Sequence, residues 1–415
     1  MAVREWSVYG VDSRRLSLGI RDRRTGGPHT PLDLTEAFGA HFLLVWEDGR
    51  VSSGELDRSE IDGDIEKALA RARSSAFDDP DAAIVLGPAP LADVEIHDPG
   101  TARIASGETG PIAARLERIR ERVANDGFRT WSGSFGATEA RARLVTSAGF
   151  DASIEATSWG WHATFDGELG DGFQARAVEP LDAFDARIGR LAETVSKLKQ
   201  PAARAPSGWR PVILHPNVVE SFVLGILLEN LDGASVAHGE SHFRAEQFGS
   251  PEPALREDLA LRVDPLEPLK AGAYRFTREG VPAAPTVFVE NGRLVTPVLN
   301  LKYARRLRLA PTGIPQAFDT LHLEGPEVLP LSEALALADG GALVLSVLGV
   351  HTQDATSGDY SLSAPQVLAI EDGRLGGRLR ATLTGNLFEA LRSEALRLVR
   401  FDGFSTPGLL LECRL

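Results

Sequence analysis

The stretch Arg210–Phe243, RPVILHPNVVESFVLGILLENLDGASVAHGESHF, decides the fold of this chain. The apolar run at residues 211–214 enters His215 and predicts a β-strand. Pro216 and Asn217 then open a segment whose apolar residues recur at helical spacing, namely Val219, Phe222, Val223, Ile226 and Leu227. We therefore expect a strand that runs directly into a helix.

A strand-to-helix junction of this kind can carry a zinc site. Zinc peptidases place two histidine ligands and a glutamate base on one helix, because zinc binds neutral imidazoles and its bound water needs a nearby proton acceptor. In this chain only the first histidine, His215, is present, and it is followed by Pro216. Proline has no side-chain acceptor, so Pro216 cannot deprotonate a metal-bound water.

A second segment with polar chemistry is Ser357-Gly358-Asp359-Tyr360-Ser361, with His351 upstream. A serine nucleophile would need His351 oriented beside it as a base, and six residues along one loop do not specify that geometry. We expect instead a loop with a turn at Gly358, in which Asp359 and Ser361 bond to nearby backbone amides.

These segments resemble the TldD/TldE (PmbA) family, whose TldD branch carries H-E-x-x-x-H and whose TldE/PmbA branch does not. On that motif His215 falls on the first histidine, Pro216 on the catalytic glutamate and Glu220 on the second histidine. Residues 357–361 resemble the family signature Thr-Gly-Asp-Phe-Ser, and Gly385-Asn-Leu resembles another family element. The resemblance covers essentially the whole chain and indicates the TldE/PmbA-like branch, which lacks the zinc motif.

The resemblance implies an α+β fold in two domains. An N-terminal domain of β-hairpins, helices and an antiparallel sheet is expected at residues 1–205, and a β-rich C-terminal domain of the TldD/PmbA type, with a pseudo-active cleft, at residues 206–415. The implied function is that of a non-catalytic subunit. It would pair with a TldD-like zinc metalloprotease to bind and process unfolded peptides or peptide precursors, and the lone chain could form a homodimer.

The expected site follows from the same resemblance. We expect no catalytic residue and no metal or cofactor in this chain, with zinc in the TldD-like partner. The vestigial metal-site positions are His215, Pro216 and Glu220. The candidates for a peptide-binding loop are His351, Ser357, Gly358, Asp359, Tyr360 and Ser361.

Two other functions stay open, and with them the question of whether the chain is itself an enzyme. One is a stand-alone metal-dependent hydrolase with a rearranged site drawn from His215, Glu220, His238, His242 and His351. His238 and His242 are four residues apart and would share one face of a helix, although Gly239 favours a loop. The other is a self-associating scaffold protein.

Composition excludes several classes of protein. Among 415 residues the net charge is −14 with no basic tract, so nucleic acid is not an expected partner. No apolar run approaches the roughly 20 residues that cross a bilayer, and the N-terminus lacks a secretory signal, so we expect a cytoplasmic protein without membrane attachment. The single cysteine, Cys413, excludes an intrachain disulfide and is expected to be a buried residue of the last strand.

The first half of the chain alternates strand and helix patterns. The strands predicted from period-two alternation are Trp6–Gly10 paired with Leu16–Ile20, a hairpin of Ala40–Trp46 with residues 51–55, and a meander of Arg129–Phe135, Glu139–Thr146 and Ser153–Phe165. Helices are predicted from the capping pair Asp57 and Glu60, from Pro111 with Arg115 facing outward, and around Phe184–Leu198. Residues 201–208 are the expected linker.

Overall fold

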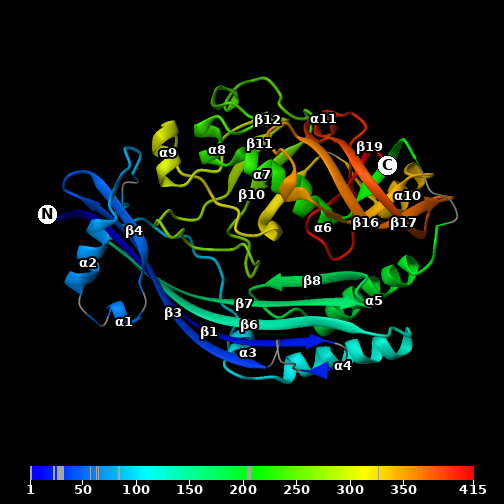
Figure 1. Cartoon of the computed structure of the whole chain (residues 1–415), viewed down its shortest axis with the longest axis horizontal. Helices are drawn as coiled ribbons and strands as arrows, with labels where there is room; N and C mark the ends of the chain where they lie inside the picture. Colours follow the sequence, from blue (N-terminus) through cyan, green and yellow to red (C-terminus); the bar gives the residue numbers. More distant parts are fainter. Residues whose placement is uncertain are drawn as a thin grey trace.

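The computed structural model describes residues 2–21, 24–25, 32–56, 58–61, 63, 65–82, 85–202, 207–325 and 327–415. One long antiparallel sheet with helices forms the N-terminal half, and a β-rich C-terminal half lies against it (Figure 1). The expected α+β fold class is confirmed. The boundary predicted at residues 205 and 206, and half of the predicted linker, lie outside the described residues.

The N-terminal sheet has the strand order β5-β4-β3-β1-β6-β7-β8, with β2 paired to β1. Its strands are β1 Val3–Arg21, β2 Arg24–Thr25, β3 Asp33–Trp46, β4 Arg50–Leu56, β5 Phe77–Asp78, β6 Trp131–Thr146, β7 Asp151–Phe165 and β8 Leu169–Ala175. The hairpin of β3 and β4 is confirmed, with its turn at residues 47–49.

Two predicted strand breaks are wrong. Residues 6–10 and 16–20 belong to the single strand β1, which pairs with β6 without interruption from Ser7 to Arg21. The strand continues through its charged middle because those side chains find partners across the sheet, as Arg14 Nε does with Glu36 Oε1 of β3 at 3.0 Å. In β6 the small residue Gly136 stays in register opposite Ser17, so the strand predicted in two pieces is one.

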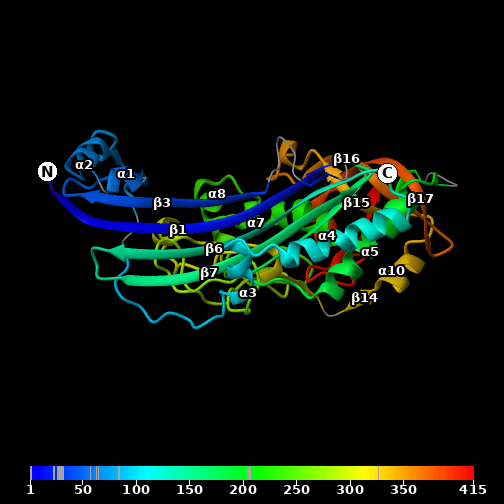
Figure 2. The same ribbon diagram turned by 90° about the horizontal axis from the view of Figure 1, so that it is seen from below.

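The N-terminal helices are α1 Arg58–Ile61, α2 Ile65–Ser74, α3 Pro99–Ala105, α4 Gly110–Asn125 and α5 Leu181–Leu198. The helix predicted from Asp57 and Glu60 is two helices, α1 and α2, and Asp57 lies outside the described residues. Figure 2 shows α4 and α5 along one end of the sheet and α1 and α2 at the other. Phe135, Trp159 and Phe184 are fully buried between the sheet and α4 and α5.

Arg115 corrects a further prediction. It was expected on the outer face of α4, but only 4% of the residue is exposed. Its guanidinium turns inward because a buried carboxylate, Glu179, accepts from its Nε at 3.0 Å. Trp159 and Trp161 donate their indole N–H groups to the same carboxylate, at 2.5 and 2.9 Å.

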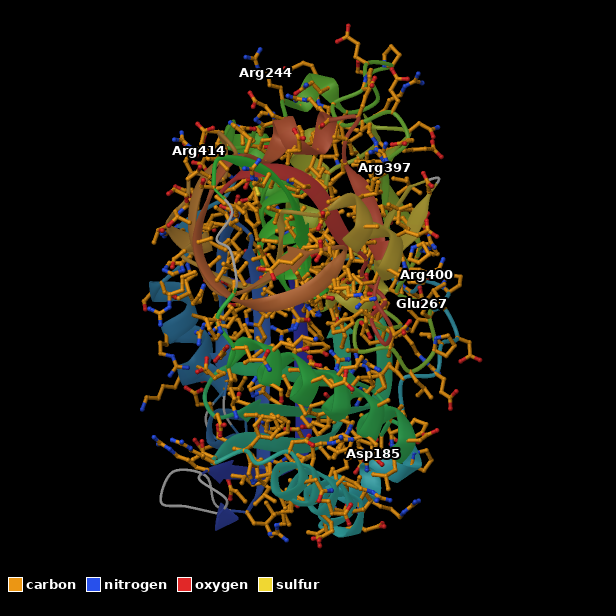
Figure 3. All side chains as sticks on the ribbon, turned by 90° about the vertical axis from the view of Figure 1, so that its right-hand side faces the viewer. Asp185, Arg244, Glu267, Arg397, Arg400 and Arg414 are labelled. Atoms are coloured by element: carbon orange, nitrogen blue, oxygen red, sulfur yellow. The ribbon has the colours of Figure 1, made fainter. Side chains whose placement is uncertain are left out.

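In the C-terminal half, β9 pairs with both β15 and β19, so β9, β15, β16, β17 and β19 close into a barrel. The strands are β9 Trp209–Leu214, β10 Ala260–Val263, β11 Thr286–Glu290, β12 Arg293–Leu294, β13 Leu321–Glu324, β14 Val328–Pro330, β15 Ala342–Leu348, β16 Asp359–Glu371, β17 Arg374–Asn386, β18 Arg397–Arg400 and β19 Gly408–Arg414. Figure 3 looks onto these strands, with Arg414 of β19 to one side and Arg397 and Arg400 of β18 to the other.

The predicted strand-to-helix junction is confirmed: β9 ends at Leu214 and the helical stretch begins at Pro216. The C-terminal helices are α6 Pro216–Val218, the π-helical η1 Val219–Leu224, α7 Gly225–Leu231, α8 Gly233–His238, α9 Leu301–Leu307, α10 Leu331–Leu337 and α11 Leu387–Arg392. Short 3-10 turns lie at η2 Ala245–Gln247, η3 Phe318–Thr320 and η4 Val350–Thr352. Within the described ranges, none of the helices is long and apolar enough to cross a membrane.

Two smaller predictions concern single residues of this half. Cys413 is 1% exposed in β19, as expected for a buried residue of the last strand. The loop expected at residues 357–361 is only partly a loop, because Asp359 begins β16 and Tyr360 pairs with Gly385 of β17.

Candidate functional site

A cleft of about 1230 Å³ lies between the end of the N-terminal sheet and the C-terminal half. On the N-terminal side it is lined by β8, by the residues after it and by Arg187 of α5. On the other side it is lined by Asn217 and Glu220 of the helix start and by residues 269–271, 316–319 and 403–405. The cleft therefore brings the vestigial metal-site helix against the edge of the N-terminal sheet.

An arginine joins the two walls of the cleft. Arg187 binds Asp171 of β8 through two hydrogen bonds, from Nε at 2.7 Å and from Nη2 at 2.8 Å. Its guanidinium carbon lies 4.5 Å from the ring centre of Phe404, which belongs to the opposite wall. Both charged side chains are only 13% exposed, so this contact holds β8 in place beside residues 403–405.

Strand β8 presents its outer edge to the cleft, and at the end of that edge Ala175 forms an isolated antiparallel bridge with Lys270. Among the described strands it pairs with β7 alone. Arg176, directly after β8, donates its backbone N–H away from β7, to Leu269 O at 2.9 Å. Because backbone direction alternates along a strand, the even-numbered residues Gly170, Gly172 and Gln174 also point their N–H and C=O groups outward, where the amide of Gly172 donates to Asp171 Oδ1 at 2.8 Å.

A second free edge borders the same groove. An adjoining hollow of about 360 Å³ shares His162, Gly170 and Asn217 with the cleft. Leu345–Val347 of β15 line it. Strand β9 pairs with β15 only at Ala342–Val344 and then leaves the sheet, so no described strand continues along β15 on that side.

His215 lies partly buried in the C-terminal wall as a neutral group. Its Nδ1 accepts the backbone N–H of Asn217 at 3.3 Å, so His215 caps the start of α6. The rings of Phe401 and Phe404 pack edge-on against the imidazole, with ring centres 5.0 and 4.8 Å away. Burial lowers the pKa of His215 to about 4, an effect that the nearby Arg187 reinforces and Asp171 opposes.

Glu220 lies at the cleft but is engaged within the chain. Its Oε1 accepts the hydroxyl proton of Thr406 at 2.7 Å. Burial raises the pKa of its carboxyl group, and the hydrogen bond from Thr406 opposes that shift. Pro216, between the two, is buried at the first position of α6 and offers no donor atom to a metal.

These residues do not fit a catalytic zinc. Such a site needs about three protein ligands and an open position, whereas this one offers one capping imidazole and one hydrogen-bonded carboxylate. In the part of the chain that the structure describes, no group of three His, Cys, Asp or Glu side chains is placed to hold a metal ion.

The Ser357–Ser361 segment is tied into the C-terminal half and does not line the cleft. Asn386 donates to Ser357 O at 2.9 Å and to Asp359 Oδ1 at 2.8 Å. Gly358 has a φ of 74°, which confirms the predicted turn. The amide of Ser361 donates to Gln353 Oε1 at 2.8 Å, so Ser361 does bond locally, but through its backbone.

Two members of the predicted loop lie in unlike surroundings. Tyr360 is 7% exposed and packs edge-on against Phe222, so it belongs to the core. His351 is exposed in η4, apart from His215 and Glu220. The peptide-binding role of residues 351 and 357–361 stays a prediction.

The remaining histidines do not meet in one site. His238 lies beside Tyr303 of α9, and its Nε2 is 3.2 Å from Arg306 Nη1. His242 stacks on Phe388 of α11, with ring centres 3.7 Å apart. The two imidazoles thus pack against different helices, because the helix ends at His238 and Gly239 turns the chain.

Sequence reasoning missed the N-terminal wall of the cleft. Strand β8 was not predicted, and neither Asp171 nor Arg187 was singled out. A signal was available, since Asp166-Gly167 directly follows the alternating pattern of β7 and is a strong hairpin sequence. Nothing local in the sequence marks Phe404 as a partner of both Arg187 and His215.

Comparison with known proteins agrees with this architecture. The profile of the PmbA/TldA metallopeptidase C-terminal domain matches residues 207–412. A protein named metalloprotease from Methanothermobacter thermautotrophicus is 25% identical over 232 residues, which cover 54% of this chain and 49% of that protein. A metalloprotease of Synechocystis is 26% identical over 237 residues, covering 52% of this chain and 48% of its own length. The chain thus aligns with about half the length of these curated relatives.

The fold as a whole also has a solved counterpart. The crystal structure of TldE from Thermococcus kodakarensis superposes with a TM-score of 0.81 at 17% identity, covering 99% of this chain and 96% of that one. At this identity the likeness establishes the fold. The match of the C-terminal profile shows that this chain belongs to the TldD/TldE (PmbA) family.

Proposed function

We propose that this chain is a non-catalytic, TldE/PmbA-like subunit that pairs with a TldD-like zinc metalloprotease and binds extended peptides in the cleft beside β8. The observation that carries the proposal is the pair of free strand edges, β8 and β15, that border one groove. A peptide in extended form can add to such an edge through its backbone, which requires no particular side-chain sequence. This suits the handling of unfolded peptides or peptide precursors.

The side chains of the C-terminal wall support the proposal that this subunit does not cleave peptides itself. Pro216 offers no base, His215 is engaged as a helix cap between two phenylalanine rings, and Glu220 accepts a hydrogen bond from Thr406. Cleavage would then depend on zinc in the partner. The names of the curated relatives place metalloprotease activity among proteins that resemble this chain.

Strand addition is tested with a matched pair of variants at Gln174. Both Gln174→Pro and Gln174→Ala remove the side chain, but only proline removes the outward N–H of β8. With a fluorescent, end-blocked peptide of about eight residues, we expect Gln174→Pro to weaken binding by roughly ten-fold and Gln174→Ala to change it little. Equal affinities for the two variants would exclude binding along this edge.

The subunit role needs a second experiment. The chain is purified alone and after co-expression with a TldD-like protein, and each sample is assayed for zinc and for peptide cleavage. We expect the lone chain to be inert and to lack stoichiometric zinc, and the pair to cleave. A lone chain that holds about one zinc and loses it on His215→Ala would instead support the stand-alone hydrolase.

A further inference from the structure

Lys270 lines the cleft, and its ammonium group has no partner among the described residues. The other charged residues that line the cleft are each engaged within the chain: Asp171 with Arg187, Glu179 with Arg115, Glu220 with Thr406, and Asp319 with two backbone amides. A half-buried cation without a counter-ion gains from an incoming anion. The cleft therefore offers the charge of Lys270 to a ligand.

Lys270 lies at the point where the chain itself fills the outer edge of β8. The bridge between Ala175, the last residue of β8, and Lys270 brings residues 269–271 to the position that a further strand would take. A peptide that adds to residues 170–174 of β8 ends or turns away there, because backbone already occupies the edge beyond. Figure 1 shows β8 at the margin of the N-terminal sheet that faces the C-terminal half.

The segment that presents Lys270 is held in a strained conformation. Leu269 has a φ of 59°, in the left-handed region that a leucine rarely adopts. Asp319 fixes the next turn, because its carboxylate accepts the backbone N–H groups of Ala271 at 2.6 Å and Gly272 at 3.0 Å. Strain of this kind persists only where the surrounding structure enforces it, and it is common at sites that bind ligands. The position of Lys270 is thus set by its surroundings.

The acid that fixes this turn has a cation of its own. Burial lowers the pKa of the Arg176 guanidinium, and the nearby Asp319 opposes that shift. Arg176 directly follows β8, on the side of the turn away from solvent. Asp319 is therefore balanced by Arg176 and by two amides, and no ion pair joins it to Lys270.

We propose that Lys270 binds the C-terminal carboxylate of a peptide that lies along β8, so that the cleft selects peptides with a free C-terminus. The inference rests on the proposed function, because it requires a peptide at the edge of β8. A carboxylate at the filled end of this edge gains an ion pair with Lys270, whereas an N-terminal ammonium group would meet a like charge. The peptide then runs parallel to β8, which also ends beside Lys270.

This selectivity describes a class of substrate. Cleavage of a peptide bond leaves a new free carboxylate on the N-terminal product. Fragments that another peptidase has already released would therefore carry the group that Lys270 recognises. An acidic side chain at the end of a peptide offers the same chemistry, so the experiment has to distinguish the two sources of the carboxylate.

The test compares one fluorescent peptide of about eight residues in two forms, with the C-terminus free or amidated and the N-terminus acetylated in both. With the wild-type chain we expect the free acid to bind roughly ten-fold more tightly than the amide. Lys270→Met keeps an unbranched side chain but loses the charge, and should bind the two forms within about two-fold of each other. Lys270→Arg keeps the charge and should restore the preference.

A third peptide, amidated and ending in glutamate, separates the chain end from an acidic side chain. We expect the wild-type chain to bind it no more tightly than the other amide. If it bound as tightly as the free acid, Lys270 would recognise any carboxylate and selection of the chain end would be wrong.

The first comparison uses only the wild-type chain, so it does not depend on the folding of a variant. Equal binding of acid and amide overturns the inference, and the proposed function still stands if Gln174→Pro weakens the binding of both. A preference that persists in Lys270→Met, shown to be folded by circular dichroism, also overturns it. If neither form binds the wild-type chain, the proposed function fails and the inference fails with it.

Discussion

The two walls of the cleft are stabilised in opposite ways. On the N-terminal side the charges are paired: Glu179, which follows β8, is bonded to Arg115 of α4, and Asp171 of β8 is bonded to Arg187 of α5. On the C-terminal side, a neutral imidazole, His215, lies between two phenylalanine rings. The C-terminal wall, which holds the vestigial metal-site positions, is thus packed with aromatic rings around His215. The N-terminal wall instead uses paired charges to hold β8 in place.

The largest expected effect comes from breaking the charged wall. Glu179→Ala leaves Arg115 buried without its carboxylate and removes the acceptor of two indole N–H groups. Side-chain exposures of 5% and 7% put this pair among buried ion pairs, whose disruption costs about 3–5 kcal/mol. Urea denaturation of the variant and of the wild-type chain measures that loss in the free energy of unfolding.

A surface pair in the same half of the chain is the control. Arg103 Nε lies 3.1 Å from Glu108 Oε2, but the two side chains are 66% and 48% exposed. Glu108→Ala should leave the denaturation midpoint nearly unchanged, because water screens such a pair. If both variants lost the same stability, burial would not be what distinguishes the charged wall.

The neutral wall should respond to acid. Because the pKa of His215 is about 4 in the folded chain and near 6.5 when unfolded, the unfolded state binds more protons between these values. The stabilising contribution of the neutral imidazole is complete above pH 6.5 and is lost as the pH falls to 4, by up to about 3 kcal/mol. Unfolding free energies measured across this range should show the loss in the wild-type chain and not in His215→Asn, which keeps a capping acceptor.

Glu220, on the same wall, changes the stability of the chain with pH in the opposite direction. Burial raises its pKa, so its contribution to stability decreases as the pH rises through that value. Glu220→Gln removes this opposing contribution. The free energy of unfolding of the variant should therefore fall more steeply with decreasing pH than that of the wild-type chain. If the unfolding free energies of the wild-type chain, His215→Asn and Glu220→Gln changed with pH in parallel, the shifted pKa values assigned to His215 and Glu220 would be wrong.

The sequence predicted the C-terminal wall better than the N-terminal one, for physical reasons. The junction at His215 is local, since a strand pattern, a proline and a helical repeat adjoin one another in the chain. Arg115 was predicted to face solvent because helical periodicity ranks residues by polarity, and the partner that buries it, Glu179, lies 64 residues away. Such a pair leaves no trace in a local pattern.

The β-strands show the same limit. Residues 12–15 suggested a break in β1, because charged side chains interrupt its alternation. Their partners come from neighbouring strands, as Glu36 does for Arg14, so the pairing that keeps the strand regular is visible only in the assembled sheet. The outer edge of β8 likewise follows from sheet order, which the sequence did not provide.

The smallest expected effect tests whether residues 357–361, which lie outside the cleft, take part in peptide binding. Asn386 caps α11 through Glu389 N at 3.0 Å and also donates to Ser357 O and Asp359 Oδ1. Asn386→Ala removes both functions and should cost about 1–2 kcal/mol. Asn386→Asp keeps the cap acceptor, removes the amide donor and adds a carboxylate that repels Asp359, so it releases residues 357–359 selectively.

Peptide affinity of these two variants decides between the cleft and the predicted loop. If the peptide lies along β8, its binding should be unchanged within about two-fold in both variants, because residues 357–361 do not line the cleft. Hydrogen exchange at residues 357–361 should nevertheless increase in Asn386→Asp, which would prove that the segment has been released. A ten-fold loss of affinity in a folded Asn386→Asp would show that the loop predicted from the sequence binds peptide, and would move the site away from the two walls.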